Sequence, residues 1–151
     1  MIGFRMVLPL AAAVFLSACA TSRPSMSYVS PDITPSDAQI LAAGSVAYLA
    51  DPLPPAKTTI VLDPPTSGKH DALTAAMLRS LRARGYGVSV VDPKTGVAAG
   101  EGIPLRYIAS PLENGFLVRL QFQAVEATRF YPRSADGKLL FGAPYMVRGG
   151  Q

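Results

Sequence analysis

The hydrophobic positions divide the chain into a short apolar leader and a longer mixed segment. Residues 6–16 form a nearly unbroken apolar run after a short stretch with one positive charge. This run of about 11 residues is too short for a transmembrane helix, which needs about 20. Small residues, Ser17 and Ala18, then precede Cys19. This layout is typical of an export signal, which we predict over residues 1–18.

The next stretch, residues 19–33, has few large apolar side chains and is rich in Ser, Pro and Thr. Such a composition buries too little surface to offset the entropy of ordering. We therefore predict a flexible tether with a root-mean-square reach of about 20 Å. A tether of this kind can also hold a short strand that adds to a partner.

A helix is predicted over residues 34–50. Thr34 is a good N-cap, a proline follows at the first helical position, and Asp37 suits the positive end of the helix dipole. The small side chains of Gly44 and Ser45 lie on one face of this helix, which allows a sheet or another helix to pack closely against it. Prolines after residue 50 end the helix.

A strand–helix–strand unit follows. The β-branched run 58–63 predicts a buried strand, and 86–91 predicts a second one. Between them, apolar side chains recur every four positions over 71–84, which predicts a helix that Gly85 ends. The recurring residues are Leu73, Met77 and Leu81.

Hairpins are predicted in the last third of the chain, after a glycine-rich mobile loop over 93–102. Strands at 105–112 and 116–123 flank an Asn-Gly pair, which is a strong hairpin signal. In the second strand, a buried set alternates with a mostly polar one. The buried set is Phe116, Val118, Leu120 and Phe122.

The same tendency continues over 125–131 and, after a turn at Asp136-Gly137, over 139–147. These segments predict a meander. We therefore expect residues 34–151 to form a single α+β domain, a small mixed β-sheet with two helices packed on it, preceded by the flexible tether.

Composition adds limits on function. A chain of 151 residues can bury a core of ordinary size. The formal charge of +4 is a weak bias, and the basic residues are scattered without interleaved aromatics. We therefore expect no direct nucleic-acid binding.

Cys19 is the only cysteine and His70 the only histidine. Disulfides and Cys-rich or His-cluster metal sites are thereby excluded within one chain, and the single histidine disfavours the usual Cys/His or Ser/His catalytic pairs. We assign no catalytic residue, no metal and no cofactor.

Several residues invite a chemical interpretation that we do not favour. Gly68-Lys69-His70 lacks the first glycine and the Ser or Thr of a phosphate loop. The acidic residues Asp63, Asp71 and Asp92 could lie close together in the fold and form a carboxylate cluster. Asp at strand ends and helix starts is the commoner explanation.

Arginines on the outer face of the sheet are a further candidate. Alternation is expected to place Arg106, Arg119 and Arg129 on that face. A solvated sheet face is the default interpretation, and an anionic partner is the alternative. Met77 and Tyr107 are expected in the core.

The segment Leu16-Ser17-Ala18-Cys19 resembles a bacterial lipobox. This resemblance implies that the Cys19 thiol receives diacylglycerol, and that the lipoprotein signal peptidase cuts just before it. A secreted chain with one unpaired thiol would otherwise be a liability. The next residue is Ala20 rather than an inner-membrane Asp signal, which favours the outer membrane, with the domain facing the periplasm.

Four segments together resemble the TrbH family of conjugal transfer lipoproteins. They are the lipobox with Ala20-Thr21 after it, Leu53-Pro54-Pro55-Ala56-Lys57-Thr58-Thr59-Ile60, the unit 72–91 with Leu81-Arg82-Ala83-Arg84-Gly85-Tyr86, and the hairpin 105–122. The Leu-Pro-Pro-Ala-Lys-Thr-Thr segment is the most specific of these.

The resemblance implies a place in a type IV secretion system, the mating-pair-formation apparatus that moves DNA between cells. It implies an assembly role at the outer membrane, beside TrbG-like and TrbI-like core proteins. It supplies no catalytic residues, so only Cys19 carries over.

Two other classes of function are the alternatives. A periplasmic module for peptidoglycan or another glycan could use Tyr28, Tyr131 and Tyr145 as platforms. A hydrolase is disfavoured because the sequence lacks paired catalytic groups.

Overall fold

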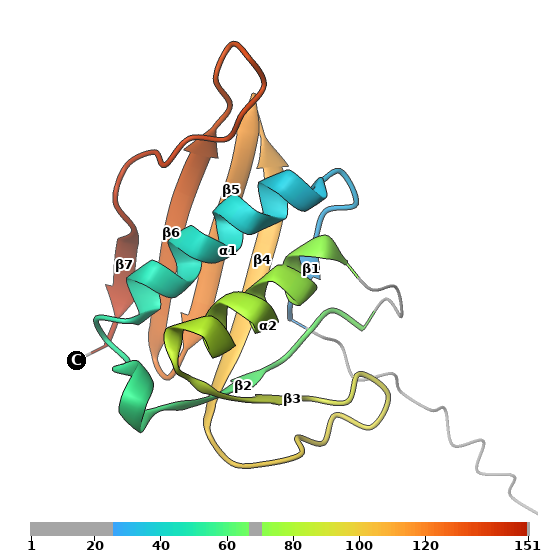
Figure 1. Ribbon diagram of the computed structural model, residues 1–151, viewed down its shortest axis with the longest axis vertical. Helices are drawn as coiled ribbons and strands as arrows, with labels where there is room; N and C mark the ends of the chain where they lie inside the picture. The colour runs from blue at the N-terminus through green and yellow to red at the C-terminus, as the bar shows by residue number, and fades with distance from the viewer. Residues whose placement is uncertain (1–25, 67–70, 151) are drawn as a thin grey trace, which may run out of the picture.

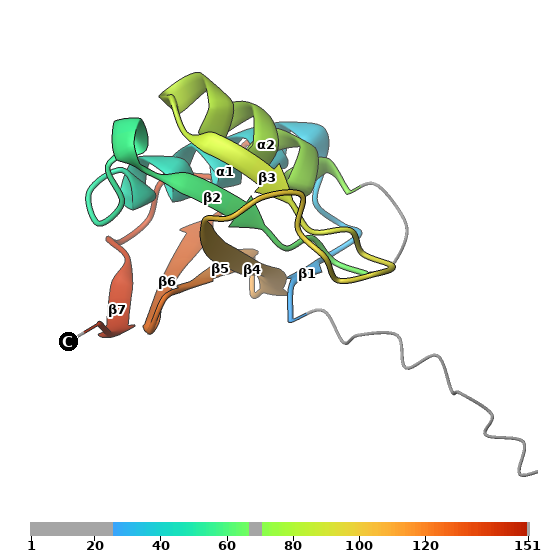
Figure 2. The same ribbon diagram turned by 90° about the horizontal axis from the view of Figure 1, so that it is seen from below.

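The computed structural model describes residues 26–66 and 71–150, which form a seven-stranded mixed sheet with both helices on one face (Figures 1 and 2). The strand order is β3-β2-β4-β5-β6-β7, with β1 beside β4. The strands are β1 (Tyr28–Val29), β2 (Thr59–Leu62), β3 (Gly87–Val90), β4 (Ile103–Leu112), β5 (Gly115–Phe122), β6 (Val125–Pro132) and β7 (Met146–Gly149). The helices are α1 (Pro35–Leu49), α2 (Ala72–Arg84) and a short 3₁₀ helix, η1 (Pro55–Lys57). The predicted α+β class is confirmed.

The first helix begins where local signals place it. The Thr34 hydroxyl accepts a hydrogen bond from the Asp37 N–H at 3.2 Å, and the Asp37 carboxylate accepts one from the Thr34 N–H at 3.3 Å. This capping box satisfies two backbone donors that a helix start would otherwise leave unpaired.

The strand–helix–strand unit is also confirmed. Strands β2 and β3 are parallel neighbours, joined by α2. Asp71 caps the helix by accepting from the Thr74 N–H at 2.6 Å. Gly85 ends it with a φ of 100°, a conformation that favours glycine.

The meander β4-β5-β6 has two-residue turns. Glu113 and Gln123 each open a turn with a φ of 49°. The Asn-Gly pair does predict the first hairpin, yet Gly115 is already the first residue of β5. A Cβ there would collide with the Tyr131 carbonyl oxygen, so close approach to β6 explains this glycine.

The strand predicted over 139–147 is wrong in its extent. Leu139 makes only an isolated bridge with Arg133, and β7 begins at Met146. Residues 140–145 form a loop, in which Pro144 has no N–H for a ladder. The same loop carries Gly142 so close to the Phe130 carbonyl that a Cβ would collide with it.

The tether predicted over 19–33 is wrong for its second half. Strand β1 pairs in parallel with β4, and the Ser30 N–H donates to the Ala109 carbonyl at 2.9 Å. Ile33 is buried in the core. Residues 19–25 lie outside the described residues. Residues 26–33 are ordered by backbone pairing with β4 and by hydrogen bonds of short serine side chains. Their low content of apolar side chains, taken alone, predicts a coil.

The core lies between the helices and the sheet face that they cover. Met77 and Tyr107 are buried there as predicted, as are the inward residues of β5. The largest fully buried side chains are Tyr107, Tyr131, Leu41, Leu49, Ile60, Leu62, Leu73, Met77, Leu81, Leu105, Leu120 and Val118. Across residues 26–66 and 71–150, no helix has the length and hydropathy needed to cross a membrane.

Candidate functional site

The described chain enters the domain at a fixed junction. Strand β4 is paired along one edge by β2, at Ile103–Leu105, and further on by β1. Ser27 fills the gap between them, because its hydroxyl donates to the Asp63 carbonyl at 2.6 Å and accepts from the Tyr107 N–H at 3.1 Å. Ser27 is buried, so the N-terminal segment is held from this residue onward.

An ion pair lies beside this junction. Arg106 Nε is 3.4 Å from the buried carboxylate of Asp63, and Arg106 Nη1 is 3.5 Å from the sulfur of Met26. Asp63, the first of the three candidate carboxylates, therefore has a structural partner. The exposed side chain of Met26 therefore contacts the arginine of this ion pair.

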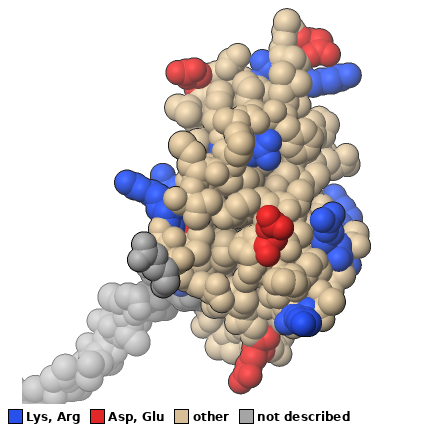
Figure 3. Space-filling model, turned by 90° about the vertical axis from the view of Figure 1, so that its left-hand side faces the viewer, with Lys and Arg blue, Asp and Glu red and all other residues tan. Residues whose placement is uncertain are grey.

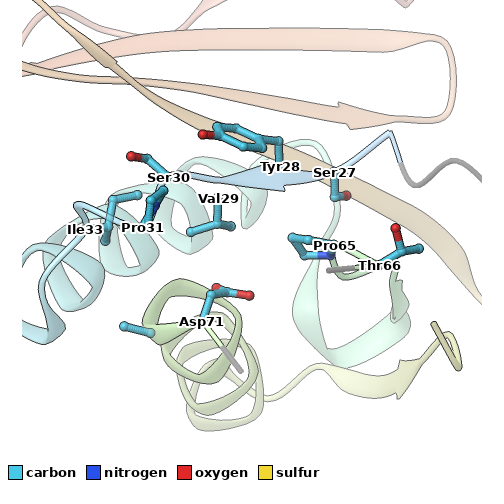
Figure 4. Close-up of a pocket in the computed structure, with 10 residues that line it drawn as sticks. Ser27, Tyr28, Val29, Ser30, Pro31, Ile33, Pro65, Thr66 and Asp71 are labelled. Carbon is cyan, nitrogen blue, oxygen red and sulfur yellow. The ribbon is translucent and has the colours of Figure 1, made fainter. Parts of the chain in front are cut away.

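A cavity of about 670 Å³ separates β1 from the start of α2 (Figure 4). Val29 points from β1 toward α2, whereas Tyr28 points to the other side of the strand. Ile33 and Pro65 add apolar walls, and Asp71 is the one charged residue among the described residues that line the cavity. Among the described residues that line it, the apolar ones predominate.

The polar groups near the cavity bond to one another. The Thr74 hydroxyl donates to Asp71 at 2.6 Å and lies 2.5 Å from the Tyr107 hydroxyl. Burial raises the pKa of Tyr107 far above its ordinary value, which keeps the phenol neutral. Asp71 caps α2, and the Thr74 hydroxyl links its carboxylate to the Tyr107 hydroxyl.

The three candidate carboxylates do not form a cluster. Asp71 caps α2, and Asp92 accepts from the Lys94 and Thr95 N–H groups at 2.7 and 3.2 Å. The prediction of strand-end and cap roles is therefore confirmed for these residues. Within the described chain, no set of three or more His, Cys, Asp or Glu could hold a metal ion. Gly68-Lys69-His70 and Cys19 lie outside the described residues.

The predicted arginine face is correct for two of its three members. Arg106 and Arg119 lie on the helix-free side, and Arg119 Nε is 3.6 Å from Glu126. Arg129 lies directly opposite Val118 in the register of β5 and β6. Because Val118 is buried beneath the helices, Arg129 lies on the helix-covered side of the sheet. Its guanidinium carbon lies 5.0 Å from the Tyr131 ring centre, in cation–π range.

The tyrosines proposed as glycan platforms are mostly inaccessible. Tyr28 is 49% exposed, but Tyr131 is fully buried. The Tyr145 hydroxyl lies 3.1 Å from the hydroxyls of both Tyr131 and Ser45, and its ring stacks on Tyr48 at 4.4 Å. Burial raises the pKa of Tyr131 and of Tyr145. The alternative glycan-binding role therefore retains one of its three residues.

The feature that the sequence reasoning missed is the free edge of β7. Among the described strands, none pairs with its outer side. Met146 is 70% exposed and Val147 51%, and Leu140 and Phe141 are exposed in the loop before them. This side of the molecule is mostly uncharged, with scattered charged side chains (Figure 3). Strand order is not visible in a sequence, although the Met-Val pair in a short terminal strand is a weak signal.

Comparison with known families extends this description. The family model described as conjugal transfer protein TrbH matches residues 20–150. The chain belongs to the TrbH family. The match covers every described residue, so β1 and the free edge of β7 both lie within the TrbH family match. No curated protein and no solved structure matches the chain.

Proposed function

We propose that this TrbH-family protein is a non-enzymatic lipoprotein of a conjugative type IV secretion apparatus. Membership of a conjugal transfer family over residues 20–150 is the observation that carries the proposal. The signal pattern 1–18 and the lipobox at Cys19 support export and lipid anchoring. Ala20 supports placement in the outer membrane, with the domain in the periplasm.

The anchor supplies attachment in this proposal. One acyl chain gives only marginal membrane binding, whereas two or more hold a protein stably. Triacylation of Cys19 would therefore keep the domain at the membrane without any transmembrane helix.

The free edge of β7 supplies docking. An edge strand offers unpaired backbone N–H and C=O groups, and an extended segment of a partner can add to it as a further strand. The exposed side chains of Met146 and Val147 would add apolar contacts. TrbG-like and TrbI-like channel core proteins are the proposed partners.

The test is conjugation from donors in which Cys19→Ser replaces the native gene. We expect transfer frequency to collapse while the exported protein persists in the periplasmic fraction, because the lipid holds the domain in place. The measurement combines transfer frequency, membrane fractionation and the mass of the N-terminal peptide. The wild-type gene supplied in trans should restore transfer.

Two outcomes would contradict the proposal at different levels. Normal transfer after deletion of the gene would remove the conjugative role altogether. Normal transfer by a stable, unlipidated Cys19→Ser protein would show that anchoring is dispensable.

A further inference from the structure

The distance between anchor and domain is short. This inference rests on the proposed lipid at Cys19. Only seven residue steps separate Cys19 from Met26, the first described residue. Fully extended they span about 24 Å, and as a flexible coil about 15 Å. A folded domain of this size is about 30 Å across, so the surface around Met26 must stay near the membrane.

The chain leaves the domain on the sheet face opposite the helices. Met26 contacts Arg106. Arg106 lies opposite Gln121 and between the buried residues Leu105 and Tyr107, so its side chain is on the helix-free side of the sheet. Figure 2 shows the start of the described chain on that side, with α1 and α2 on the other. The attachment point therefore turns the helix-free face, rather than the helices, toward the lipid.

The helix-free face has a composition that suits an anionic membrane surface. One row across the sheet reads Tyr28, Ile108, Arg119, Thr128 and Met146. The next row reads Arg106, Gln121, Glu126 and Arg148. These side chains are partly or fully exposed.

The arginines and the exposed tyrosine of this face both favour contact with an anionic lipid surface. The two rows carry three arginines and one acid, Glu126. Glu126 pairs with Arg119, and Arg106 pairs with the buried Asp63, so Arg148 is the arginine of these rows without an ion pair among the described residues. Arginines are attracted to anionic headgroups, and tyrosine favours the boundary between water and lipid. Tyr28 is the exposed aromatic residue nearest to the described start of the chain.

We propose that the helix-free face of the sheet lies against the anionic lipid surface to which Cys19 is anchored. The helices then face away from the membrane. The β7 edge lies at the border of the same face, because Met146 ends the first row. A partner strand added to β7 would therefore run close to the membrane surface.

Tryptophan fluorescence tests this orientation, since the chain contains no tryptophan. Tyr28→Trp places a reporter on the helix-free face, and Ala47→Trp places one on the exposed surface of α1 as the matched control. Each lipidated full chain is reconstituted into vesicles of phosphatidylglycerol and brominated phosphatidylcholine. Unchanged thermal unfolding of both variants confirms their folding.

We expect the Tyr28→Trp reporter to lose most of its fluorescence to the brominated chains, and the Ala47→Trp reporter to keep most of its own. Replacing phosphatidylglycerol with phosphatidylcholine should weaken the quenching of Tyr28→Trp. Equal quenching of the two reporters would overturn the proposal and leave the face free for a protein partner. Quenching independent of the anionic lipid would overturn the role of the arginines.

The result is separable from the proposed function. A chain with an unmodified Cys19 can be coupled through its only thiol to a maleimide phospholipid, which reproduces the attachment point. The orientation can then be measured even if cells do not lipidate the protein. Conjugation frequency reports on the proposed function alone.

Discussion

Gly44 shows how a single residue sets the distance between helix and sheet. A Cβ at this position would collide with the Tyr131 hydroxyl and lie 3.1 Å from Cε1 of Phe141. Glycine inside a helix costs about 1 kcal/mol relative to alanine. The close approach of α1 to β6 offsets that cost, because it lets the hydroxyls of Ser45, Tyr131 and Tyr145 meet in one cluster.

Gly44→Ala should therefore destabilise the protein despite the better helix propensity of alanine. We expect the free energy of unfolding to fall by about 1–3 kcal/mol, as for other overpacked cores. Urea unfolding followed by circular dichroism measures this.

The second-site variant gives a sharper test. Tyr131→Phe removes the hydroxyl that the new methyl group meets, so Gly44→Ala should cost less in the Tyr131→Phe background. A Gly44→Ala protein more stable than the wild type would refute this account of the packing.

At the scale of elements, an ion pair ties the start of α1 to the residue after β6. Two hydrogen bonds of 3.1 Å join the Arg133 guanidinium to the Asp37 carboxylate, whose side chain is only 4% exposed. Burial raises the pKa of Asp37, but the hydrogen bonds from Arg133 and Thr34 and the charge of Arg133 outweigh it. The net pKa lies below its ordinary value.

This lowered pKa predicts a dependence of stability on pH. An unfolded Asp has a pKa of about 3.9, so the stabilisation from Asp37 is complete above that value and is lost as pH falls through the folded pKa. Asp37→Asn should lower the free energy of unfolding at pH 7 by about 2 kcal/mol. The difference from wild type should shrink below about pH 4.

Urea unfolding at a series of pH values measures the effect. Asp51→Asn makes the same charge change at an exposed position and should show little difference at any pH. A cost of Asp37→Asn that stays constant down to pH 2 would show that the ionised carboxylate is not the source.

At the scale of the whole molecule, the sheet presents β7 as a free outer strand with every residue exposed. Proteins usually protect such edges with charges or prolines, whereas β7 carries Met146 and Val147 beside Arg148. An edge left this apolar is consistent with a partner that covers it.

Val147→Lys should block docking without unfolding the domain, because a lysine on an edge strand opposes the addition of another strand. We expect transfer frequency to fall while the free energy of unfolding changes by less than about 0.5 kcal/mol. Val97→Lys changes another exposed valine in the loop before β4 and is the matched control. Equal transfer by the two variants would argue against the β7 edge as the docking site.

Much of the fold follows from short-range signals. The capping residues Thr34 and Asp71 and the stop at Gly85 determine the helix ends, because each acts on backbone groups within four positions. The alternation in β5 predicts its buried face for the same reason, since neighbouring side chains of a strand point to opposite sides.

Long-range pairing was decisive elsewhere. The two-residue turn before β6 sets Phe122 opposite Val125. This register sets Arg129 opposite the buried Val118, so Arg129 lies on the helix-covered face and not on the outer face. Strand β1 has only two residues, and its place depends on β4 and on the bonds of Ser27, about 36 and 80 positions away. Neither effect has a local signature.

The amino-acid sequence thus determines the helices, the hairpins, the α+β class and the family, together with the lipobox that predicts an anchor at Cys19. The tertiary structure alone decides that Ser27 and β1 belong to the domain, which arginines share a face and which strand is left at the edge. The physical reason is that caps and alternation depend on groups a few residues apart. Strand register and order depend on hydrogen bonds between segments that only the folded chain brings together.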